Sequence, residues 1–387
     1  MTSSGSETAL PRKRRRMRMP TRVRRASIVS VIIGGFCVGA VVAATARESV
    51  PNPAAGGPHI SLVGKGEAFS IAWLGDTLLG DAGQPLLDLY GLTWPAAHVP
   101  PPADADLVIA NAEGPFTDHV EAFDPLQRWS YQAQPRTAGA LAAIGIDAIS
   151  LSNNHVMDRG PTGLFDTMTH ARAAGLLTFG GGSTSEQARL PLMIKTDIGT
   201  IAVVGFADDS GLNIARRDRP GIRQLSPKSI VEDIQLARRA GADRVVAHVQ
   251  WGENYAPLDG RQRALAHALA AAGYDLVVGL HPHVVQPVEI VDGVPVIYSI
   301  GNYVFTTPGR FTDAAPGYGL VLTTEFRASG RLTLRMRCIQ TDNDVVLYQP
   351  RPCDASQARA LLGSLNPQIE LQGDVAQLDV QLPAARS

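Results

Sequence analysis

The sequence has little cysteine, few aromatic residues and few charges for its length. Its three Cys residues include no C-x-x-C spacing, which argues against a structural zinc site built on cysteine. Charged residues make up 18% of the chain and hydrophobic residues 45%, so global disorder and coiled coil are excluded. The 38 glycines and 27 prolines follow no repeat, which excludes collagen. The 387 residues suit one large domain or two smaller ones.

The charges are distributed unevenly along the chain. Nine basic residues and no acidic residue lie between Arg12 and Arg25. Without residues 1–46 the chain keeps 26 of its 35 basic and 35 of its 36 acidic residues, which gives a formal charge of −9. Binding to nucleic acid needs a basic field, so we expect no nucleic-acid partner for this body.

An uncharged run of 20 residues, 27–46, follows the basic block. An apolar helix of about 20 residues crosses a bilayer, and a basic flank keeps its own end in the cytoplasm. We therefore predict a basic cytoplasmic tail at 1–26, a single-pass membrane anchor at 27–46 and an extracytoplasmic body. The alternative is a signal segment cleaved near Ala46, which would make the protein secreted. Residues 47–66, which include a stretch rich in Pro, Gly and Ala, are predicted to form a linker.

The export prediction bears on the cysteines. Cys37 lies in the predicted membrane segment, whereas Cys338 and Cys353 lie near the C-terminus. In an oxidising compartment these two could form one disulfide.

The body alternates short β-branched runs with helical stretches. We expect strands near 69–74, 106–110, 147–151, 200–206, 243–249, 275–280 and 294–300. We expect helices over 137–144, 163–174, 227–240 and 260–272. Near-continuous apolar strands that alternate with helices are typical of α/β proteins with buried sheets. A hairpin of 319–326 with 331–339 predicts a mixed sheet or a second sheet.

Polar side chains that can bind metal follow six of the predicted strands. They are Asp76, Asn111, Glu113, Asn153, Asn154, His155, His248, His281, His283 and Asn302. Ligands of open α/β sheets bind beyond the carboxyl ends of the strands, so we expect these side chains to converge. Carboxylate, amide and imidazole ligands favour Mn, Fe or Zn, as one ion or as two ions about 3.5–4 Å apart. Taken singly, each has a structural alternative, such as a helix cap for Asp76.

The His-x-His segment gives a more specific expectation. Alternate residues of an extended strand point to the same side, and the proline between the two histidines forbids helix. We therefore expect the imidazoles of His281 and His283 on one side of an extended segment.

Six ordered stretches resemble the bacterial capsule-synthesis family called CapA, or poly-γ-glutamate biosynthesis proteins. They are WLGDTLLG (73–80), ANAEGPFTD (110–118), LSNNHVMDRGPTGLFDT (151–167), HVQWGENY (248–255), GLHPHVVQPVE (279–289) and YSIGNYVF (298–305). This family is similar to the calcineurin-like metallophosphoesterases. The resemblance implies a four-layer α/β/β/α sandwich over 67–342, followed by a C-terminal extension at 343–387.

The resemblance also implies roles for single residues. Two ligand sets are implied: Asp76, Glu113 and His283 for one ion, and Glu113, Asn154, His248 and His281 for the other. Asp76 and His155 would be catalytic, with His155 as the acid for the leaving group. Leu78 stands where the phosphoesterases have a histidine ligand, so we expect the second set to bind its ion more tightly. Supporting or substrate-contacting residues would be Asn111, Asp158, Glu253, Gln286 and Asn302.

Two functions follow from this resemblance. The first is an extracytoplasmic, metal-dependent hydrolase of the phosphoesterase type that serves capsule or poly-γ-glutamate biosynthesis. Its substrate would be an anionic cell-surface polymer or a phosphoester. The alternative is a non-catalytic subunit of the same fold that binds the polymer or assists its export beside membrane synthase subunits.

Overall fold

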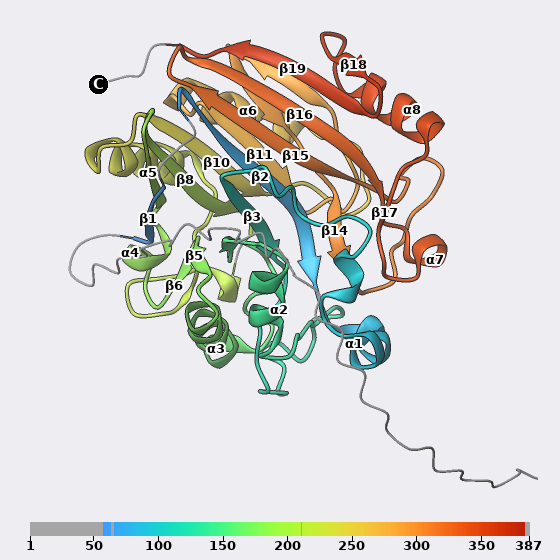
Figure 1. Cartoon of the computed structure of the whole chain (residues 1–387). Coiled ribbons are helices and arrows are strands. Elements are labelled where there is room, and N and C mark those ends of the chain that lie inside the picture. The colour runs from blue at the N-terminus through green and yellow to red at the C-terminus, as the bar shows by residue number, and fades with distance from the viewer. Residues whose placement is uncertain (1–56, 63–65, 210, 384–387) are drawn as a thin grey trace, which may run out of the picture. The chain divides into compact units, whose positions relative to one another are not determined.

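A computed structural model describes residues 57–62, 66–209 and 211–383 (Figure 1). These described residues all belong to one compact unit. The predicted tail and membrane segment, 1–26 and 27–46, lie outside the described residues. Among the residues that are described, no helix combines the length and the hydropathy needed to cross a membrane.

Ten strands of the described residues form the larger of two sheets (Figure 1). Eight run in the order β18 (Glu370–Gln372), β19 (Val375–Gln381), β16 (Arg331–Gln340), β15 (Tyr318–Arg327), β2 (Ala68–Leu78), β3 (Leu107–Ala112), β4 (Ala148–Ser150) and β5 (Leu177–Phe179). In addition, β14 (Asn302–Phe305) pairs with β2, and β17 (Arg351–Pro352) pairs with β16. Strands β2 to β5 and β14 pair in parallel, whereas β15 to β19 pair antiparallel, so the sheet is mixed.

Seven strands of the described residues form the second sheet. Their order is β1 (His59–Ser61), β7 (Leu192–Thr196), β8 (Gly199–Ala207), β10 (Arg244–Gln250), β11 (Leu276–Leu280), β13 (Val294–Ile297) and β12 (Val288–Val291). Strands β8, β10, β11 and β13 pair in parallel. Helix α5 lies between β8 and β10 in the chain and α6 between β10 and β11, as expected for parallel neighbours. A separate ribbon joins β6 (Gly181–Gly182) and β9 (Gly221–Ile222).

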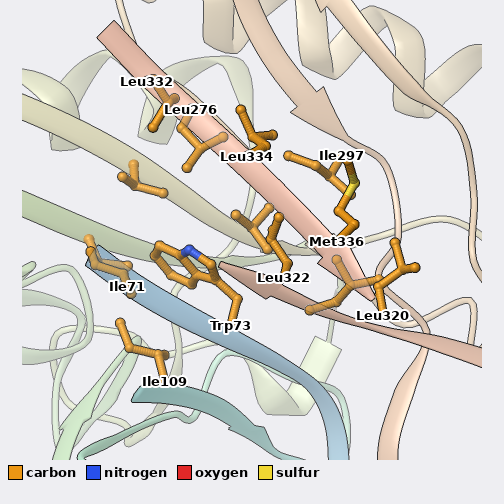
Figure 2. Packing of buried hydrophobic residues seen from close by; sticks show 14 of the residues in the cluster. Ile71, Trp73, Ile109, Leu276, Ile297, Leu320, Leu322, Leu332, Leu334 and Met336 are labelled. Atoms are coloured by element: carbon orange, nitrogen blue, oxygen red, sulfur yellow. The ribbon is translucent and has the colours of Figure 1, made fainter. Parts of the chain in front are cut away.

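The two sheets pack face to face over an apolar core. Figure 2 shows Trp73 of β2 and Ile109 of β3 among side chains of the facing sheet, such as Leu276 and Ile297. All four side chains are fully buried. Burial of apolar surface contributes about 25 cal/mol per Å², so this interface is a main source of the stability of the fold.

Helices cover the outer face of each sheet. Helices α2 (Thr137–Ala143) and α3 (Gly160–Ala173) pack on the larger sheet, and α5 (Pro227–Arg239) and α6 (Gly260–Ala272) pack on the second. The layers therefore run helix, sheet, sheet, helix. The remaining helices of the described residues are α1 (Gln84–Tyr90), α4 (Ser185–Ala188), α7 (Asn343–Val346) and α8 (Ala355–Leu365), and the 3-10 turns are η1 (Asp81–Gly83), η2 (Trp94–Ala96) and η3 (Gly211–Asn213).

Local sequence explains where the main helices begin and end. Ser226 and Asp259 are the N-caps of α5 and α6, and each forms a capping box with the third residue of its helix. Gly273 ends α6 with a φ of 100°, a left-handed conformation that glycine adopts without steric cost. The prediction of a mixed α/β fold with a late hairpin is confirmed.

Two segments that were predicted to lie outside the folded domain form strands of its sheets. Residues 59–61 of the predicted linker are not linker but the edge strand β1, which pairs in parallel with β7. In the predicted C-terminal extension, β19 pairs with β16 along seven residues. The disulfide between Cys338 and Cys353 is confirmed, with their Cα atoms 5.5 Å apart.

Candidate metal centre

Three buried side chains meet at the carboxyl ends of β2, β3 and β11. Asp76, Glu113 and His283 each offer a ligand atom, and these atoms lie within 4.8 Å of one another. Within the described part of the chain, no other three His, Cys, Asp or Glu side chains lie this close together. The prediction that strand ends bring metal-binding groups together is therefore met by these three.

A bulge in β2 positions Asp76. The pairing of β2 with β3 shifts register between Leu74 and Asp76. Gly75, between them, lies so close to β14 that a Cβ atom there would be 1.7 Å from the carbonyl oxygen of Gly301. Only glycine permits this approach, which brings Asn302 of β14 beside Asp76 in the sheet register.

The imidazole of His283 lies between the two carboxylates. Its Nδ1 is 2.8 Å from Asn302 Oδ1 and 3.3 Å from Asp76 Oδ2, and its Nε2 is 3.7 Å from Glu113 Oε1. A proton on Nδ1 satisfies Asn302, and Nε2 then faces Glu113. Asn302 is thus a supporting partner of His283, as expected.

The expectation of an extended His-x-His segment is wrong. His281 and His283 have φ angles of 95° and 59°, so both lie in the left-handed region and the chain turns after β11. The turn aims the backbone N–H of His281 at Asp76 Oδ2, over 3.3 Å. The two rings are still neighbours, with centroids 6.2 Å apart.

Asn111 supports both carboxylates. Its Nδ2 donates to Asp76 Oδ1 over 2.9 Å and to Glu113 Oε2 over 3.4 Å. Its own oxygen accepts from Asn153 Nδ2 over 3.1 Å. Asn153 also accepts at Oδ1 from the backbone N–H of His155, so it connects the carboxylates to the turn after β4.

The two carboxylates have opposite pKa shifts. Burial alone would raise the pKa of Asp76, but the hydrogen bond and charge of His283 outweigh it and hold this pKa below its ordinary value. Burial, and then the negative charge of Asp76, raise the pKa of Glu113 well above its ordinary value. Two buried acids this close favour a bound cation, because it stabilises both negative charges.

The second predicted ligand set contains buried polar atoms without partners. Neither ring nitrogen of His248 has a hydrogen-bond partner, nor does His281 Nδ1 or Glu113 Oε1. Burial lowers the pKa of both His248 and His281 to about 3, which leaves neutral rings with free lone pairs. Buried polar atoms are normally satisfied, so these unpaired nitrogens are suited to accept a divalent cation. Among the described residues, however, the ligand atoms of Glu113, His248 and His281 do not all lie within 4.8 Å of one another, so the structure brings together the first predicted set and not the second.

His248 lies between aromatic side chains of the inter-sheet core. Its ring centroid is 6.0 Å from that of Trp73 and 5.7 Å from that of Phe179. Gln250, two residues further along β10, donates a hydrogen bond to Asn154 Oδ1. It therefore supports a predicted ligand, and it is not among the residues predicted from the sequence. The period of two along a strand could have found it, because it places Gln250 on the face of His248.

His155 is paired with Asp158, one of the residues expected to have a supporting or substrate-contacting role. His155 Nδ1 is 2.8 Å from Asp158 Oδ2, which fixes the proton on Nδ1 and leaves Nε2 free for a substrate. Asp158 also accepts from the backbone N–H of Tyr131 over 2.5 Å and from Gln127 Nε2 over 2.9 Å. The ring of Tyr131 packs on His155, with centroids 4.3 Å apart.

Two predicted supporting residues lie apart from these contacts. Gln286 exchanges hydrogen bonds with Gln262 and donates to the carbonyl of Ala256, so it supports the loop before α6. Glu253 is exposed in the same loop.

The sequence of this fold matches a known family. A model of the family described as "Bacterial capsule synthesis protein PGA_cap" matches residues 70–307. The chain belongs to this family. The matched range contains all six predicted ligands and His155, so the whole candidate metal centre lies within the PGA_cap region.

Named proteins of other bacteria match part of this chain, and two of them illustrate the similarity. The PGA biosynthesis protein CapA of Bacillus subtilis is 32% identical over 244 residues, which are 62% of this chain and 64% of that protein. A probable polyglutamine synthesis accessory protein of Mycobacterium tuberculosis is 32% identical over 212 residues, 51% of this chain and 55% of that protein. The match therefore spans less than two thirds of the length of either relative.

Solved structures of calcineurin-like phosphoesterases resemble the chain at a low level. One is the phosphoesterase YfkN from Bacillus subtilis, with a TM-score of 0.35 and 12% sequence identity. The alignment covers 81% of this chain and 91% of that one.

Proposed function

We propose that this PGA_cap protein is an extracytoplasmic, metal-dependent hydrolase of the phosphoesterase type that serves capsule or poly-γ-glutamate biosynthesis. Residues 27–46 would hold it at the cell membrane with its N-terminus in the cytoplasm, or be removed by cleavage near Ala46. The proposal rests mainly on one observation: Asp76, Glu113 and His283 bring their ligand atoms within 4.8 Å of one another in a buried place, where Glu113 Oε1 has no hydrogen-bond partner.

Each part of the site has a task in such a reaction. One or two divalent ions, with Mn, Fe or Zn the best matches, would supply an activated water and neutralise charge on a phosphoryl or carbonyl centre. Asp76, Glu113 and His283 would hold one ion, and Glu113, Asn154, His248 and His281 the other. With a proton on both ring nitrogens, His155 would donate the one on Nε2 to the leaving oxygen, while Asp158 holds the Nδ1–H and keeps the ring oriented.

Turnover of a generic phosphodiester tests this proposal. The full chain, purified in mild detergent, should hydrolyse bis(p-nitrophenyl) phosphate only with Mn²⁺ present. His155→Ala should lower kcat by about 10²–10⁴-fold, the usual contribution of a general acid, and leave bound metal unchanged. His267→Ala, at an exposed position of α6, is the matched control. Equal activity of His155→Ala and wild type would remove the proposed role of His155.

A non-catalytic accessory subunit is the second candidate. Leu78 cannot coordinate a metal, so the first ligand set is one side chain short of the phosphoesterase pattern that the sequence resembles. The Mycobacterium relative is also named an accessory protein. This candidate predicts no turnover of any phosphodiester, together with metal-dependent binding of poly-γ-glutamate or of membrane synthase subunits.

A further inference from the structure

Two arginines share one aromatic ring near the metal centre. The guanidinium carbons of Arg128 and Arg310 lie 5.1 Å and 5.7 Å from the ring centroid of Trp129. Arg310 also lies 4.8 Å from the ring centroid of Tyr255. All three distances are typical of cation–π contacts. Within the described residues, neither arginine forms an ion pair with a carboxylate.

This pair of cations is linked directly to the predicted metal ligands. The ring of Tyr255 is 5.5 Å from that of His283, and its backbone N–H donates to the carbonyl of Pro282 over 2.8 Å. Tyr255 therefore fills the space between Arg310 and His283. If the reacting group of a polymeric substrate lies at the metal centre, the neighbouring repeat of that substrate would lie on the other side of the Tyr255 ring, at Arg310.

The loop that carries Arg310 is held in place. Thr312 and Ala315 exchange two backbone hydrogen bonds, of 3.1 Å and 3.0 Å. The ring of Phe311 folds over Gly309, where a Cβ atom would lie 2.0 Å from it, and also packs edge-on against Tyr255 at 5.3 Å. These contacts orient the guanidinium before any ligand binds, which reduces the entropy lost on binding.

Charge explains why such a site is needed. The body carries a formal charge of −9, so it repels a polyanion at long range. Local recognition must then come from cations without a carboxylate partner of their own. A guanidinium suits this task, because its planar fork binds a carboxylate with two parallel hydrogen bonds.

We propose that Arg310, seated on Tyr255 and Trp129 and assisted by Arg128, binds a free α-carboxylate of an oligo-γ-glutamate substrate. The bound carboxylate belongs to the repeat next to the one at the metal centre. This inference rests on the proposed function and names the substrate class of that same site.

Binding of a defined oligomer tests the inference. The full chain with Mn²⁺ is titrated with hexa-γ-glutamate by calorimetry, and tripolyphosphate is the comparison anion. Arg310→Gln should weaken hexa-γ-glutamate binding about tenfold or more, as expected for a lost charge-assisted hydrogen-bond pair. Arg310→Lys keeps the positive charge but lacks the planar guanidinium. Its affinity for hexa-γ-glutamate should lie between the affinities of the wild type and of Arg310→Gln. Arg359→Gln, an equal charge change at an exposed position of α8, should stay within about twofold of wild type.

Three outcomes would overturn the inference. The first is that Arg310→Gln and Arg359→Gln bind hexa-γ-glutamate with equal affinity. The second is that Arg310→Gln loses affinity for tripolyphosphate but not for hexa-γ-glutamate. The third is that the wild type does not bind hexa-γ-glutamate. Turnover of bis(p-nitrophenyl) phosphate by the wild-type preparation tests the proposed function separately. A wild type that turns over the diester, with no effect of Arg310→Gln on oligomer binding, would remove the inference and leave the proposed function intact.

Discussion

Gln250 and Asn154 exchange two hydrogen bonds across the two sheets. Gln250 Nε2 donates to Asn154 Oδ1 over 2.9 Å, and the backbone N–H of Asn154 donates to Gln250 Oε1 over 2.9 Å. Gln250 ends β10 of the second sheet, whereas Asn154 follows β4 of the larger one. The predicted amide ligand is therefore oriented by a residue of the opposite sheet.

Loss of this pair should weaken metal binding. Gln250→Leu removes both bonds to Asn154, and loss of a partner that orients a ligand typically costs about 10–100-fold in metal affinity. Titration of the metal-free full chain with Mn²⁺ measures the change. Gln368→Leu, at an exposed position after α8, should bind Mn²⁺ as the wild type does. Unchanged affinity in Gln250→Leu would mean that Asn154 is not a ligand or needs no support.

The two ligand sets can be separated by single substitutions. Asp76 belongs only to the first set and His248 only to the second. If the second set binds its ion more tightly, His248→Gln should lose the tightly held ion and Asp76→Asn should retain it. Elemental analysis after gel filtration measures the ratio of metal to protein. Retention by His248→Gln with loss in Asp76→Asn would reverse the predicted order.

Local patterns in the sequence were sufficient for most of the fold. Strands such as β8 and β10 are long apolar runs, and α5 and α6 have capping boxes and a following glycine, so each element has a signal of its own. Strand β1 has only three residues in a segment rich in Pro and Gly. It forms because β7 offers a free edge, which is a long-range contact with no local signal.

The residues of the site were easier to predict than their geometry. Asp76, Glu113 and His283 were found because polar residues after apolar strands are unusual. The left-handed backbone at His281 and His283 was missed, because positive φ is rare for residues other than glycine. The period of two along β10 places Gln250 on the face of His248, but its contact with Asn154 depends on how the two sheets pack and cannot be predicted from either stretch alone.

The disulfide should contribute measurably to stability. Cys338 and Cys353 are 15 residues apart, and closing a loop of that size stabilises a protein by about 3 kcal/mol in the chain-entropy account. The double variant Cys338→Ala, Cys353→Ala should lower the free energy of unfolding in urea by that order. A Cys37→Ala background keeps the third thiol from reacting. Reductant should lower the stability of that background to the level of the double variant, and no effect of reductant would contradict the prediction.

The buried histidines should make the metal-free protein sensitive to acid. His248 has an ordinary pKa of 6.5, which burial lowers to about 3 in the folded chain. Between these values the unfolded state binds a proton at this residue and the folded state does not, so stability falls as pH falls below 6.5. From pH 6.5 to 5 this residue alone should lower the free energy of unfolding by about 1.5 kcal/mol.

Replacement of His248 by leucine should remove the fall in the free energy of unfolding between pH 6.5 and 5. It would also show that this residue lowers the stability of the metal-free protein. Leucine leaves no unpaired nitrogen in the apolar space beside Trp73 and Phe179, so metal-free His248→Leu should be more stable than wild type at pH 5. Urea unfolding of the chelator-treated full chain at several pH values gives the slope of the free energy of unfolding against pH for each protein. His267→Leu, on the exposed face of α6, should keep the wild-type slope. Parallel curves for His248→Leu and wild type would show that His248 does not carry the acid sensitivity, and that its nitrogens have partners in the metal-free protein.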